Sequence, residues 1–415
     1  MSFWPASCHA VLRPLKRVCR MNPDVLSEQT DPGYEFEYID IGSVSPEYGV
    51  VYTERMRFND SPSRARKPVQ GGDVIVSTVR TYLKAVAYTV ASDVPQIAST
   101  GFAVLRAKPG IEPRFLYRVV QSNPFVEAVV SRSTGVSYPA INPSDMGRIP
   151  IPLPDLGTQR AIAEFLDRET ARIDQLIEKK EQFLSFASLR IEALVATAIS
   201  DPNVTRIRFG NAARRVSRPV SLSEHDQLVR LGLFNRGRGI FKKPAADEEG
   251  MGASSFYFVE SGDLILSGQF AWEGAVALAS DEEEGCVVSH RYPIYQGIAG
   301  VSTAYLLALF RSKFGDFILN DASRGSAGRN RPLNTWRLEK EKIPVADQGL
   351  QSEVQRAILF ERRLKKITEV SIERLREFRS ALITAAVTGQ IDVSSWGKQG
   401  STDRRLDQIE KEMAS

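Results

Sequence analysis

Gly72-Asp73-Val74-Ile75-Val76-Ser77 returns 190 residues later as Gly262-Asp263-Leu264-Ile265-Leu266-Ser267. In both places a turn-forming Gly-Asp pair leads into an apolar run that ends in serine, which is typical of a short buried strand. Two further landmarks repeat at similar spacing: Ile149-Pro150 returns as Ile343-Pro344, and residues 193–199 (ALVATAI) return as residues 381–387 (ALITAAV). Because the landmarks keep their order, the sequence predicts two similar domains, each followed by the same kind of segment.

The predicted division of the chain has five parts. Residues 1–154 form head 1, residues 155–201 a first long helix, residues 202–347 head 2, residues 348–391 a second long helix, and residues 392–415 a polar tail. Each head has mixed α/β character, with short strands separated by Gly, Pro and Asn turns and followed by a helix and a polar loop. In head 1 we expect strands at 37–41, 73–77 and 101–105, a helix over 113–130 and a loop over 131–139. In head 2 we expect strands at 262–267 and 286–289, a helix over 302–320 and a loop over 323–332.

The two long helices are predicted from apolar residues that recur at alternating steps of three and four. They run from about Thr158 to Ser200 and from about Glu353 to Thr388. Ser352 and Gln355 predict a capping box at the second start, and Gly389 predicts the second end. A helix of this length extends about 60 Å and would expose its apolar stripe if alone, so we expect the two to pack on each other as an antiparallel coiled coil.

The residues expected in this helix-helix seam are mostly aliphatic or aromatic. Glu169, Lys180 and Glu361 interrupt the pattern, so we expect imperfect packing where they lie. The predicted seam residues are Ile162, Leu166, Ile173, Leu176, Phe183, Leu194, Ile358, Leu364, Leu375, Phe378 and Leu382.

Charge is more informative in its distribution than in its total. The net charge of the 415 residues is only +4, but basic clusters occur at 64–67, 236–243 and 324–331 in Gly-, Ser- and Pro-rich surroundings, whereas acidic runs lie at 247–249 and 281–284. Segregated cations on loops suit a surface that neutralises DNA phosphates. The alternative, that each run is a solvated loop tip, remains open. Two similar heads would suit a protein that reads two separated half-sites on one duplex.

No reaction centre or targeting segment is recognisable. We find no P-loop, no G-x-S-x-G, no H-E-x-x-H and no EF-hand pattern, and Asp73 and Asp263 are expected to be turn residues that lead into a strand. Cys8, Cys19 and Cys286 form no C-x-x-C pair, so buried inert thiols are favoured over a metal site. No apolar run reaches the roughly 18 residues of a membrane span, and no signal peptide is recognisable, so we expect a soluble, cytoplasmic protein that binds without catalysing.

Taken together, these strings resemble a type I restriction–modification specificity subunit. The resemblance lies in residues 72–77, in residues 149–154 leading into Gln159-Arg160-Ala161-Ile162-Ala163, in residues 173–180, and in the repeats at 355–358 and 381–391. It covers essentially the whole chain except the last twenty or so residues. One departure is that the second proline stretch is reduced to residues 343–347.

The resemblance implies two target-recognition domains separated by two antiparallel helices, each domain reading one half of a bipartite DNA target. It implies that the chain carries no cofactor and no activity of its own. It also implies assembly with two modification (methyltransferase) subunits, which bring S-adenosylmethionine, and with restriction subunits that use ATP and Mg²⁺. The helix pair would then act as a ruler for the unread spacer.

Candidate DNA contacts lie after the Gly-Asp strand and in the polar loop of each head, because phosphate contacts set the register while polar side chains read base edges. The alternative for each residue is a satisfied loop side chain or a contact to the methyltransferase. In head 1 the candidates are Ser77, Thr78, Arg80, Tyr82, Lys84, Arg132, Ser133, Ser137, Tyr138 and Asn142. In head 2 they are Ser267, Gln269, Trp272, Arg324, Ser326, Arg329, Asn330, Arg331 and Asn334.

Two other classes of function compete with this interpretation. A coiled-coil adaptor whose two heads bind protein explains the duplication and the helices equally well, but gives no reason for Arg-, Gly- and Asn-rich loops in both heads. A self-sufficient restriction enzyme lacks its motifs. Salt-sensitive DNA binding would separate the adaptor from the DNA reader. The target bases themselves do not follow from the sequence.

Overall fold

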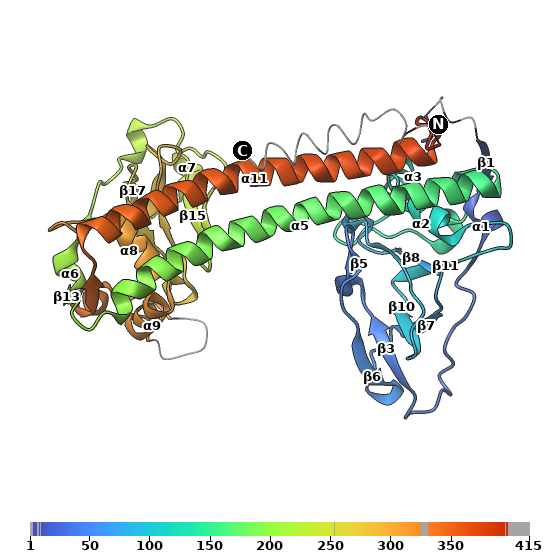
Figure 1. The fold of residues 1–415 in the computed structure, drawn as a ribbon, viewed down its shortest axis with the longest axis horizontal. Helices are drawn as coiled ribbons and strands as arrows, with labels where there is room; N and C mark the ends of the chain where they lie inside the picture. The colour runs from blue at the N-terminus through green and yellow to red at the C-terminus, as the bar shows by residue number, and fades with distance from the viewer. Residues whose placement is uncertain are drawn as a thin grey trace. The chain divides into compact units, whose positions relative to one another are not determined.

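The structure is a computed structural model that describes residues 3–5, 8, 10–252, 254–324, 331–394 and 396. It divides into two compact units, which we describe separately. Unit 1 lies within residues 1–178 and 371–415, and unit 2 within residues 179–370. Helix α5 (Leu156–Ser200) and helix α11 (Gln348–Val387) each contribute to both units (Figure 1). Each unit therefore combines one head with a part of both long helices.

Both long helices begin at an aspartate. The carboxylate of Asp155 accepts hydrogen bonds from the backbone N–H of Thr158 (3.0 Å) and from its hydroxyl (2.6 Å). The carboxylate of Asp347 accepts from the N–H of Leu350 (2.9 Å). The second helix thus starts earlier than predicted, and the predicted capping box is wrong. Ser352 lies inside the helix, where its hydroxyl donates to the carbonyl of residue 348 (2.7 Å).

The other end of α11 follows the prediction. The helix ends at Val387, and Gly389 adopts the left-handed conformation (φ +71°) that terminates many helices.

The internal repeat has a different register in the helices than the sequence motifs indicate. Gln159 and Gln351, not Gln159 and Gln355, hold equivalent places: the side-chain oxygen of Gln159 accepts from the N–H of Glu112 (2.9 Å), and that of Gln351 accepts from the N–H of Ser302 (2.7 Å). The offset is 192 residues at these starts and 188 residues at the ALVATAI and ALITAAV landmarks. Between the two landmarks, α5 therefore holds four residues, about one turn, more than α11.

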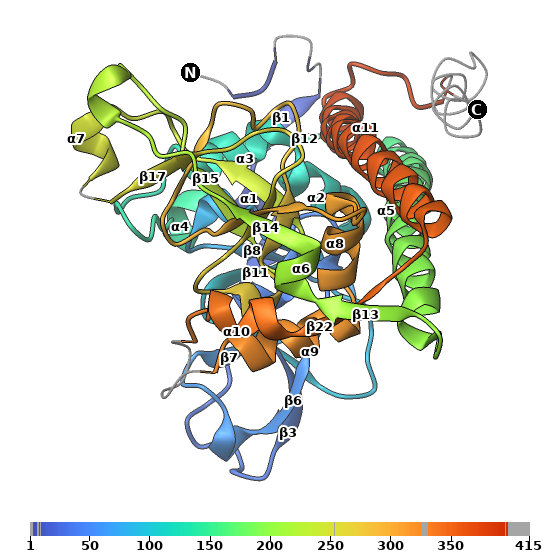
Figure 2. The ribbon, with the colours of Figure 1, turned by 90° about the vertical axis from the view of Figure 1, so that its left-hand side faces the viewer.

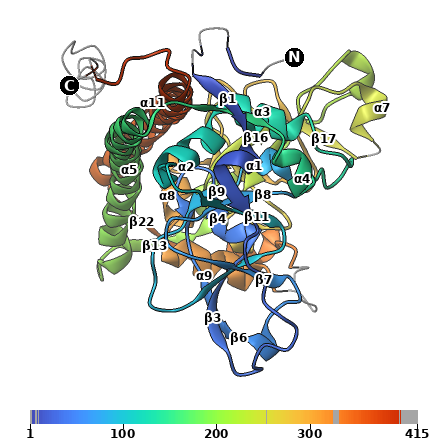
Figure 3. The same ribbon diagram turned by 90° about the vertical axis from the view of Figure 1, so that its right-hand side faces the viewer.

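Unit 1 is built on two four-stranded sheets (Figure 3). The first sheet has the order β2-β11-β8-β9, with all neighbours antiparallel, and the second has the order β6-β3-β10-β7. The strands of the first are β2 (Cys19–Met21), β8 (Val74–Ser77), β9 (Val86–Tyr88) and β11 (Phe102–Ala107). Those of the second are β3 (Glu35–Ile39), β6 (Glu54–Arg57), β7 (Ala65–Val69) and β10 (Gln96–Ser99). Two short pairs complete the unit: β1 (Val11–Pro14) with β12 (Pro150–Leu153), and β4 (Val44–Ser45) with β5 (Gly49–Val50).

The helix predicted over 113–130 is in fact two helices. Pro124 lacks a backbone N–H and sits in the first turn of the second helix, where that N–H would have no partner, so the chain breaks at Ser122. Phe115 and Leu116 of the first helix join the core of unit 1 with residues of both long helices. The helices of the head are α1 (Leu15–Val18), α2 (Pro113–Gln121), α3 (Asn123–Val130) and α4 (Pro143–Met146), with 3-10 turns η1 (Ile41–Ser43), η2 (Phe58–Asp60) and η3 (Thr81–Leu83).

Unit 2 is built around one four-stranded sheet of order β14-β21-β18-β19. Figure 2 labels the edge strand β14 of this sheet. Its members are β14 (Ala213–Val216), β18 (Leu264–Leu266), β19 (Val276–Leu278) and β21 (Ile294–Gly297). Three two-stranded pairs are β13 (Thr205–Arg208) with β22 (Lys342–Val345), β15 (Leu231–Phe234) with β16 (Gly239–Lys242), and β17 (Phe256–Phe258) with β20 (Val287–Ser289). The helices are α6 (Phe209–Ala212), α7 (Glu248–Met251), α8 (Thr303–Phe310), α9 (Lys313–Ala322) and α10 (Thr335–Lys340), with η4 (Leu222–Glu224) and η5 (Ala271–Glu273).

Most predicted seam residues are buried, with one clear exception. Phe183 is 50% exposed, because the buried face of α5 passes through Lys180, Leu184 and Ala187 and leaves Phe183 one residue off the seam. The fully buried members are Ile162, Leu166, Ile173, Leu176, Ile358, Leu375 and Leu382, and the partly buried ones are Leu194, Leu364 and Phe378.

Helix α5 is more apolar than the sequence analysis indicated. It contains an 18-residue window of mean hydropathy 1.5, and within the described residues it is the helix that is long and apolar enough to cross a membrane. Ile162 and Leu166 belong to the core of unit 1, and Ile191 and Val195 belong to the core of unit 2. Only 17% of that window is buried, so packing in the two cores accounts for part of the apolar character of α5 and leaves Phe183, Phe186 and Leu189 exposed.

Candidate nucleic-acid interface

Head 1 brings its two predicted contact segments together. The segment after β8 and the loop after α3 are joined by a hydrogen bond between the hydroxyls of Thr81 and Ser133 (2.8 Å) and by one from the N–H of Ile141 to the carbonyl of Thr78 (2.9 Å). Ser133 also donates to the carbonyl of Val129 (2.9 Å). Residues more than fifty positions apart in the sequence thus form one surface.

The side chains that project from this surface are cationic and aromatic. Arg80 and Lys84 flank η3 and both adopt the left-handed backbone conformation (φ 50° and 52°), which is uncommon for residues other than glycine. Tyr82 and Tyr138 are more than half exposed. Cations can bind phosphates, and exposed rings can contact sugars and bases, so the chemistry suits a nucleic-acid backbone and its grooves.

Two of the candidates in head 1 face inward. The hydroxyl of Ser77 donates to the carbonyl of Val79 (2.5 Å), and the hydroxyl of Thr78 donates to the carbonyl of Gly101 (2.8 Å). Their exposures are 3% and 6%. These positions do not fit the predicted contact with DNA, because the strand end that carries both residues is covered and their hydroxyls already have partners.

Three further candidates lie on the surface. Ser137 is exposed. Arg132 donates to the carbonyl of Ala128 (2.8 Å) and stacks on the ring of Phe3. Asn142 caps helix α4 by accepting from the N–H of Ser144 (3.0 Å).

Head 2 joins the equivalent segments in the same way. The N–H of Leu333 donates to the carbonyl of Gly268 (2.8 Å), and the guanidinium of Arg331 lies 5.2 Å from the ring centroid of Trp272. Arg331 also donates to the side chain of Asn320 (3.2 Å). The exposed Gln269 accepts, through its carbonyl, the indole N–H of Trp272 (3.1 Å).

The remaining candidates of head 2 have other surroundings. Ser267 is 3% exposed and accepts from the N–H of Phe270 (3.1 Å), so it does not fit the predicted contact with DNA either. Arg324 pairs with Asp321. Asn334 caps helix α10, accepting from the N–H of Arg337 (3.0 Å). Ser326, Arg329 and Asn330 lie outside the described residues.

The repeated aspartates have a structural role, as predicted. Asp73 is buried and accepts two hydrogen bonds of 2.8 Å from Arg106 and one of 2.9 Å from the N–H of Gln70. Asp263 accepts from Arg218 (2.8 Å) and, likewise, from the N–H three residues earlier (2.9 Å). The hydrogen bonds from Arg106 to Asp73 raise the pKa of that guanidinium. Both aspartates close the turn that leads into the strand.

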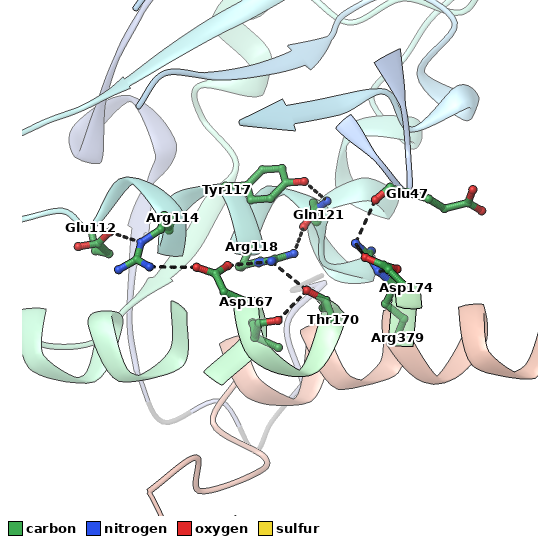
Figure 4. Close-up of polar contacts among 11 residues, drawn as sticks. Glu47, Glu112, Arg114, Tyr117, Arg118, Gln121, Asp167, Thr170, Asp174 and Arg379 are labelled. Carbon is green, nitrogen blue, oxygen red and sulfur yellow. Dashed lines mark hydrogen bonds and ion pairs between the residues drawn. The ribbon is translucent and has the colours of Figure 1, made fainter. Parts of the chain in front are cut away.

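A charged joint that the sequence analysis missed fixes head 1 to the long helices (Figure 4). Arg118 of α2 donates to the carboxylate of Asp167 (2.8 Å) and to the hydroxyl of Thr170 (3.0 Å), both on α5. Arg114, one turn earlier, donates to Asp167 (3.0 Å). The i, i+4 spacing of the two arginines was a usable signal, because it places both on one face of a helix. The joint orients the head and offers no reactive group to a substrate.

Metal-ligating chemistry is not apparent in the described part of the chain, where no three His, Cys, Asp or Glu residues cluster. Cys19 is buried, and this burial raises the pKa of its thiol to about 12. Burial also raises the pKa of Cys286. These two thiols fit the prediction of buried, inert cysteines.

Comparison with known proteins finds a family match in the N-terminal part of the chain. Residues 27–184 match the family model of the type I restriction modification DNA specificity domain. The type I restriction enzyme StySPI specificity subunit of Salmonella potsdam is 30% identical over 104 residues, which are 25% of this chain and 22% of that protein. The aligned part thus spans about a fifth of that relative's length.

A solved structure shares the fold of nearly the whole chain. It comes from a study of complex assembly and conformational transition of the type I R-M system, with a TM-score of 0.59, 22% identity, and coverage of 94% of this chain and 99% of the other. The predicted fold class is confirmed by this likeness, and the predicted resemblance is confirmed by the domain match together with the aligned relative.

Proposed function

From the match of residues 27–184 to the type I restriction modification DNA specificity domain, we propose that the chain is the DNA sequence-recognition subunit of a type I restriction–modification complex. The observation that carries the proposal is the pair of joined loop surfaces. In each head, the loop after the Gly-Asp strand and the loop before the long helix meet through a cation stacked on an aromatic ring. Each head reads one half of a bipartite target.

The side chains of each surface have two different roles in DNA binding. Exposed cations such as Arg80 and Lys84 bind phosphates and set the position of the head on the duplex, and neighbouring polar and aromatic groups read base edges. The heads differ in these residues, Tyr82 and Tyr138 in one and Gln269 and Trp272 in the other, so they read different half-sites. The helix pair sets the length of the unread DNA between them.

The partners in this proposal are double-stranded DNA, two modification subunits and the restriction subunits. S-adenosylmethionine belongs to the modification subunits, and ATP with Mg²⁺ belongs to the restriction subunits. The chain itself orients DNA and partners without catalysing, in the cytoplasm. An adaptor whose heads bind protein would leave the two cation–aromatic loop surfaces without a purpose.

The test is single-molecule methylome sequencing in a host that lacks type I systems. The host receives this chain together with its presumed methyltransferase, and a second culture receives the methyltransferase alone. We expect a bipartite motif with methylated adenine in the first culture only. If the methyltransferase is folded and both subunits are expressed but no motif appears, the proposal fails and the adaptor takes its place.

A further inference from the structure

An open cavity of about 550 Å³ lies between the β15–β16 hairpin of head 2 and both long helices, entirely within unit 2. The tip of the hairpin is Arg236-Gly237-Arg238. Strand β19 and Ile240 give the cavity an apolar wall, together with Ile358 of α11. The volume lies in the range of small-molecule sites.

The equivalent hairpin of head 1, β4–β5, is closed onto the helices by opposite charges. The carboxylate of Glu47 at its tip pairs with Arg376 of α11 (3.0 Å). The carbonyl of Glu47 accepts from Arg379 of the same helix (3.1 Å), as Figure 4 shows. Arg379 in turn pairs with Asp174 of α5 (3.0 Å). Each arginine of this joint is thus paired with a carboxylate, Arg376 with Glu47 and Arg379 with Asp174.

In head 2 the charge at the tip is reversed. The carbonyl of Arg238 accepts from Lys365 of α11 (2.7 Å), as that of Glu47 accepts from Arg379, but within the described residues no carboxylate pairs with the arginines of this tip. Two arginines replace the glutamate, and the stretch of α5 that lines the cavity offers Leu184, Ser185 and Ser188, which carry no charge. Helix α11 adds further cations, Arg362, Lys365 and Lys366.

The carboxylates that line the cavity are already engaged. Glu361 binds Arg311 through two hydrogen bonds (2.6 and 2.8 Å), and Glu282 pairs with Lys366. Glu283 accepts from the N–H and the hydroxyl of Ser280, and Glu369 lies 3.9 Å from Lys365.

Three arginines therefore line the cavity without an ion pair. Within the described residues, neither Arg236 nor Arg238 nor Arg362 forms one with a carboxylate. Arg362 donates to the carbonyl of Leu278 (2.6 Å), and Arg238 donates to the carbonyl of Asn235 (3.1 Å) and lies over the ring of Phe234. Arginine binds phosphate through paired N–H groups, so three such side chains beside an apolar wall suit a phosphate-bearing molecule.

We propose that this cavity binds a phosphate group, supplied either by a free nucleotide or by the backbone of bound DNA. The apolar wall receives the base or sugar, and the arginines receive the phosphate. The DNA source rests on the proposed function, whereas the nucleotide source does not.

The experiment uses the purified full chain and two kinds of probe. Isothermal titration with pyrophosphate and with ATP measures the free ligand, and fluorescence anisotropy with a 40-base-pair duplex of mixed sequence, over a series of salt concentrations, measures DNA. Two test variants act differently: Arg236→Asn with Arg238→Gln removes two exposed cations, and Ser185→Glu places a carboxylate among the arginines. The control, Arg214→Gln with Arg215→Gln, removes two exposed arginines from β14 of the same head.

Either of two results supports the proposal. Binding of ATP and pyrophosphate that weakens at least tenfold in both test variants, and less than twofold in the control, identifies a nucleotide site. A fall of about two in the salt slope of duplex binding in the double variant, beyond that of the control, identifies DNA phosphates as the source. Thermal melts within about 2 °C of the parent establish that the variants are folded.

The proposal is overturned if ATP and pyrophosphate do not bind at millimolar concentration and the duplex salt slope of the test variants equals that of the control. Failure of the proposed function is a separate observation, the absence of a bipartite methylation motif. A chain that directs methylation normally but shows no phosphate binding contradicts only the inference about the cavity.

Discussion

The guanidinium of Arg80 lies 4.8 Å from the centroid of the Tyr138 ring and thereby joins the loop after β8 to the loop after α3. In head 2 the same two loops are joined by Arg331 and Trp272, but the roles are exchanged: the ring follows the strand and the cation comes from the later loop. The two heads thus preserve the contact and not the residues that make it. A cation held over a ring keeps unused N–H groups for a phosphate or a base edge.

Replacing Arg80 with alanine is expected to weaken specific DNA binding by head 1 about tenfold or more, because one cation–aromatic contact and one potential phosphate or base contact are lost. Anisotropy with a duplex carrying the methylation motif measures this. Arg55→Ala is the matched control, since Arg55 is also an exposed arginine of head 1 but lies on β6, with Glu35 as its partner. Equal losses of DNA affinity in the two variants would show that the loop after β8 does not contact DNA.

Two substitutions of Arg331 distinguish the contribution of its charge from that of its stacking on Trp272 in head 2. Arg331→Ala is expected to lower the salt slope of DNA binding by about one, because one phosphate contact is lost. Arg331→Lys keeps the charge and should keep the slope, while losing the planar contact with Trp272. A slope that is unchanged in the alanine variant would show that this residue does not contact phosphate.

Gln351 and Gln355 test the register of the repeat. The amide of Gln351 is buried and accepts from the N–H of Ser302, and it also donates to the carbonyl of Ala346 (2.8 Å). Gln351→Ala is expected to lower the free energy of unfolding by about 1–3 kcal/mol, because a buried donor loses its partner.

Gln355 is exposed on the same helix and is the matched control. Its replacement by alanine should change the stability by less than about 0.5 kcal/mol. Urea unfolding of both variants decides between the two glutamines. A larger loss of unfolding free energy for Gln355→Ala than for Gln351→Ala would show that Gln355 is the equivalent of Gln159, as the sequence motif indicates.

Glu361 makes the stability of unit 2 depend on pH. Burial alone would raise the pKa of this carboxyl, but hydrogen bonds from Arg311 and Ser188 and the charge of Arg311 hold it below its ordinary value of 4.5. A group whose pKa is lowered in the folded state contributes stability above its unfolded pKa and loses it as the pH falls through the folded pKa. We therefore expect the melting temperature to decrease when the pH is lowered below about 4.5.

Glu361→Gln supplies the comparison for this titration. The variant keeps the size of the side chain but does not titrate, so its melting temperature should be lower than that of the parent at pH 7 and should change less between pH 6 and pH 3.5. Identical pH profiles for the two proteins would show that Glu361 does not contribute.

The strand that follows each Gly-Asp pair and the two long helices were predictable because their patterns are local, whereas the helices predicted over 113–130 and 302–320 are each two helices. The apolar run of the strand at 74–77 and the apolar stripe of α5 can each be recognised from a short stretch of sequence. It was harder to predict which residue of α11 corresponds to Gln159 of α5. Gln351 and Gln355 are one helical turn apart, so they lie near each other on the helix surface. Only the contact of Gln351 with head 2 distinguishes them.

The candidate interface was predictable as two segments and not as individual contacts. Ser77 and Arg80 lie three residues apart, yet one is buried at the end of a strand and the other projects from a left-handed turn. That difference depends on how the chain leaves the sheet. The pairing of Arg80 with Tyr138 and of Arg118 with Asp167 depends on tertiary packing, which no local pattern records.

Unit 1 is assembled from two segments that unit 2 separates in the sequence, and this affects the order in which the two units can fold during synthesis. Its core includes Leu15 and Ile162 together with Leu382 and Ala386, which are made after the whole of unit 2. Residues 179–370 of unit 2 are continuous and can pack as soon as they emerge. The head that is synthesised first is therefore completed last, after translation has delivered the end of α11.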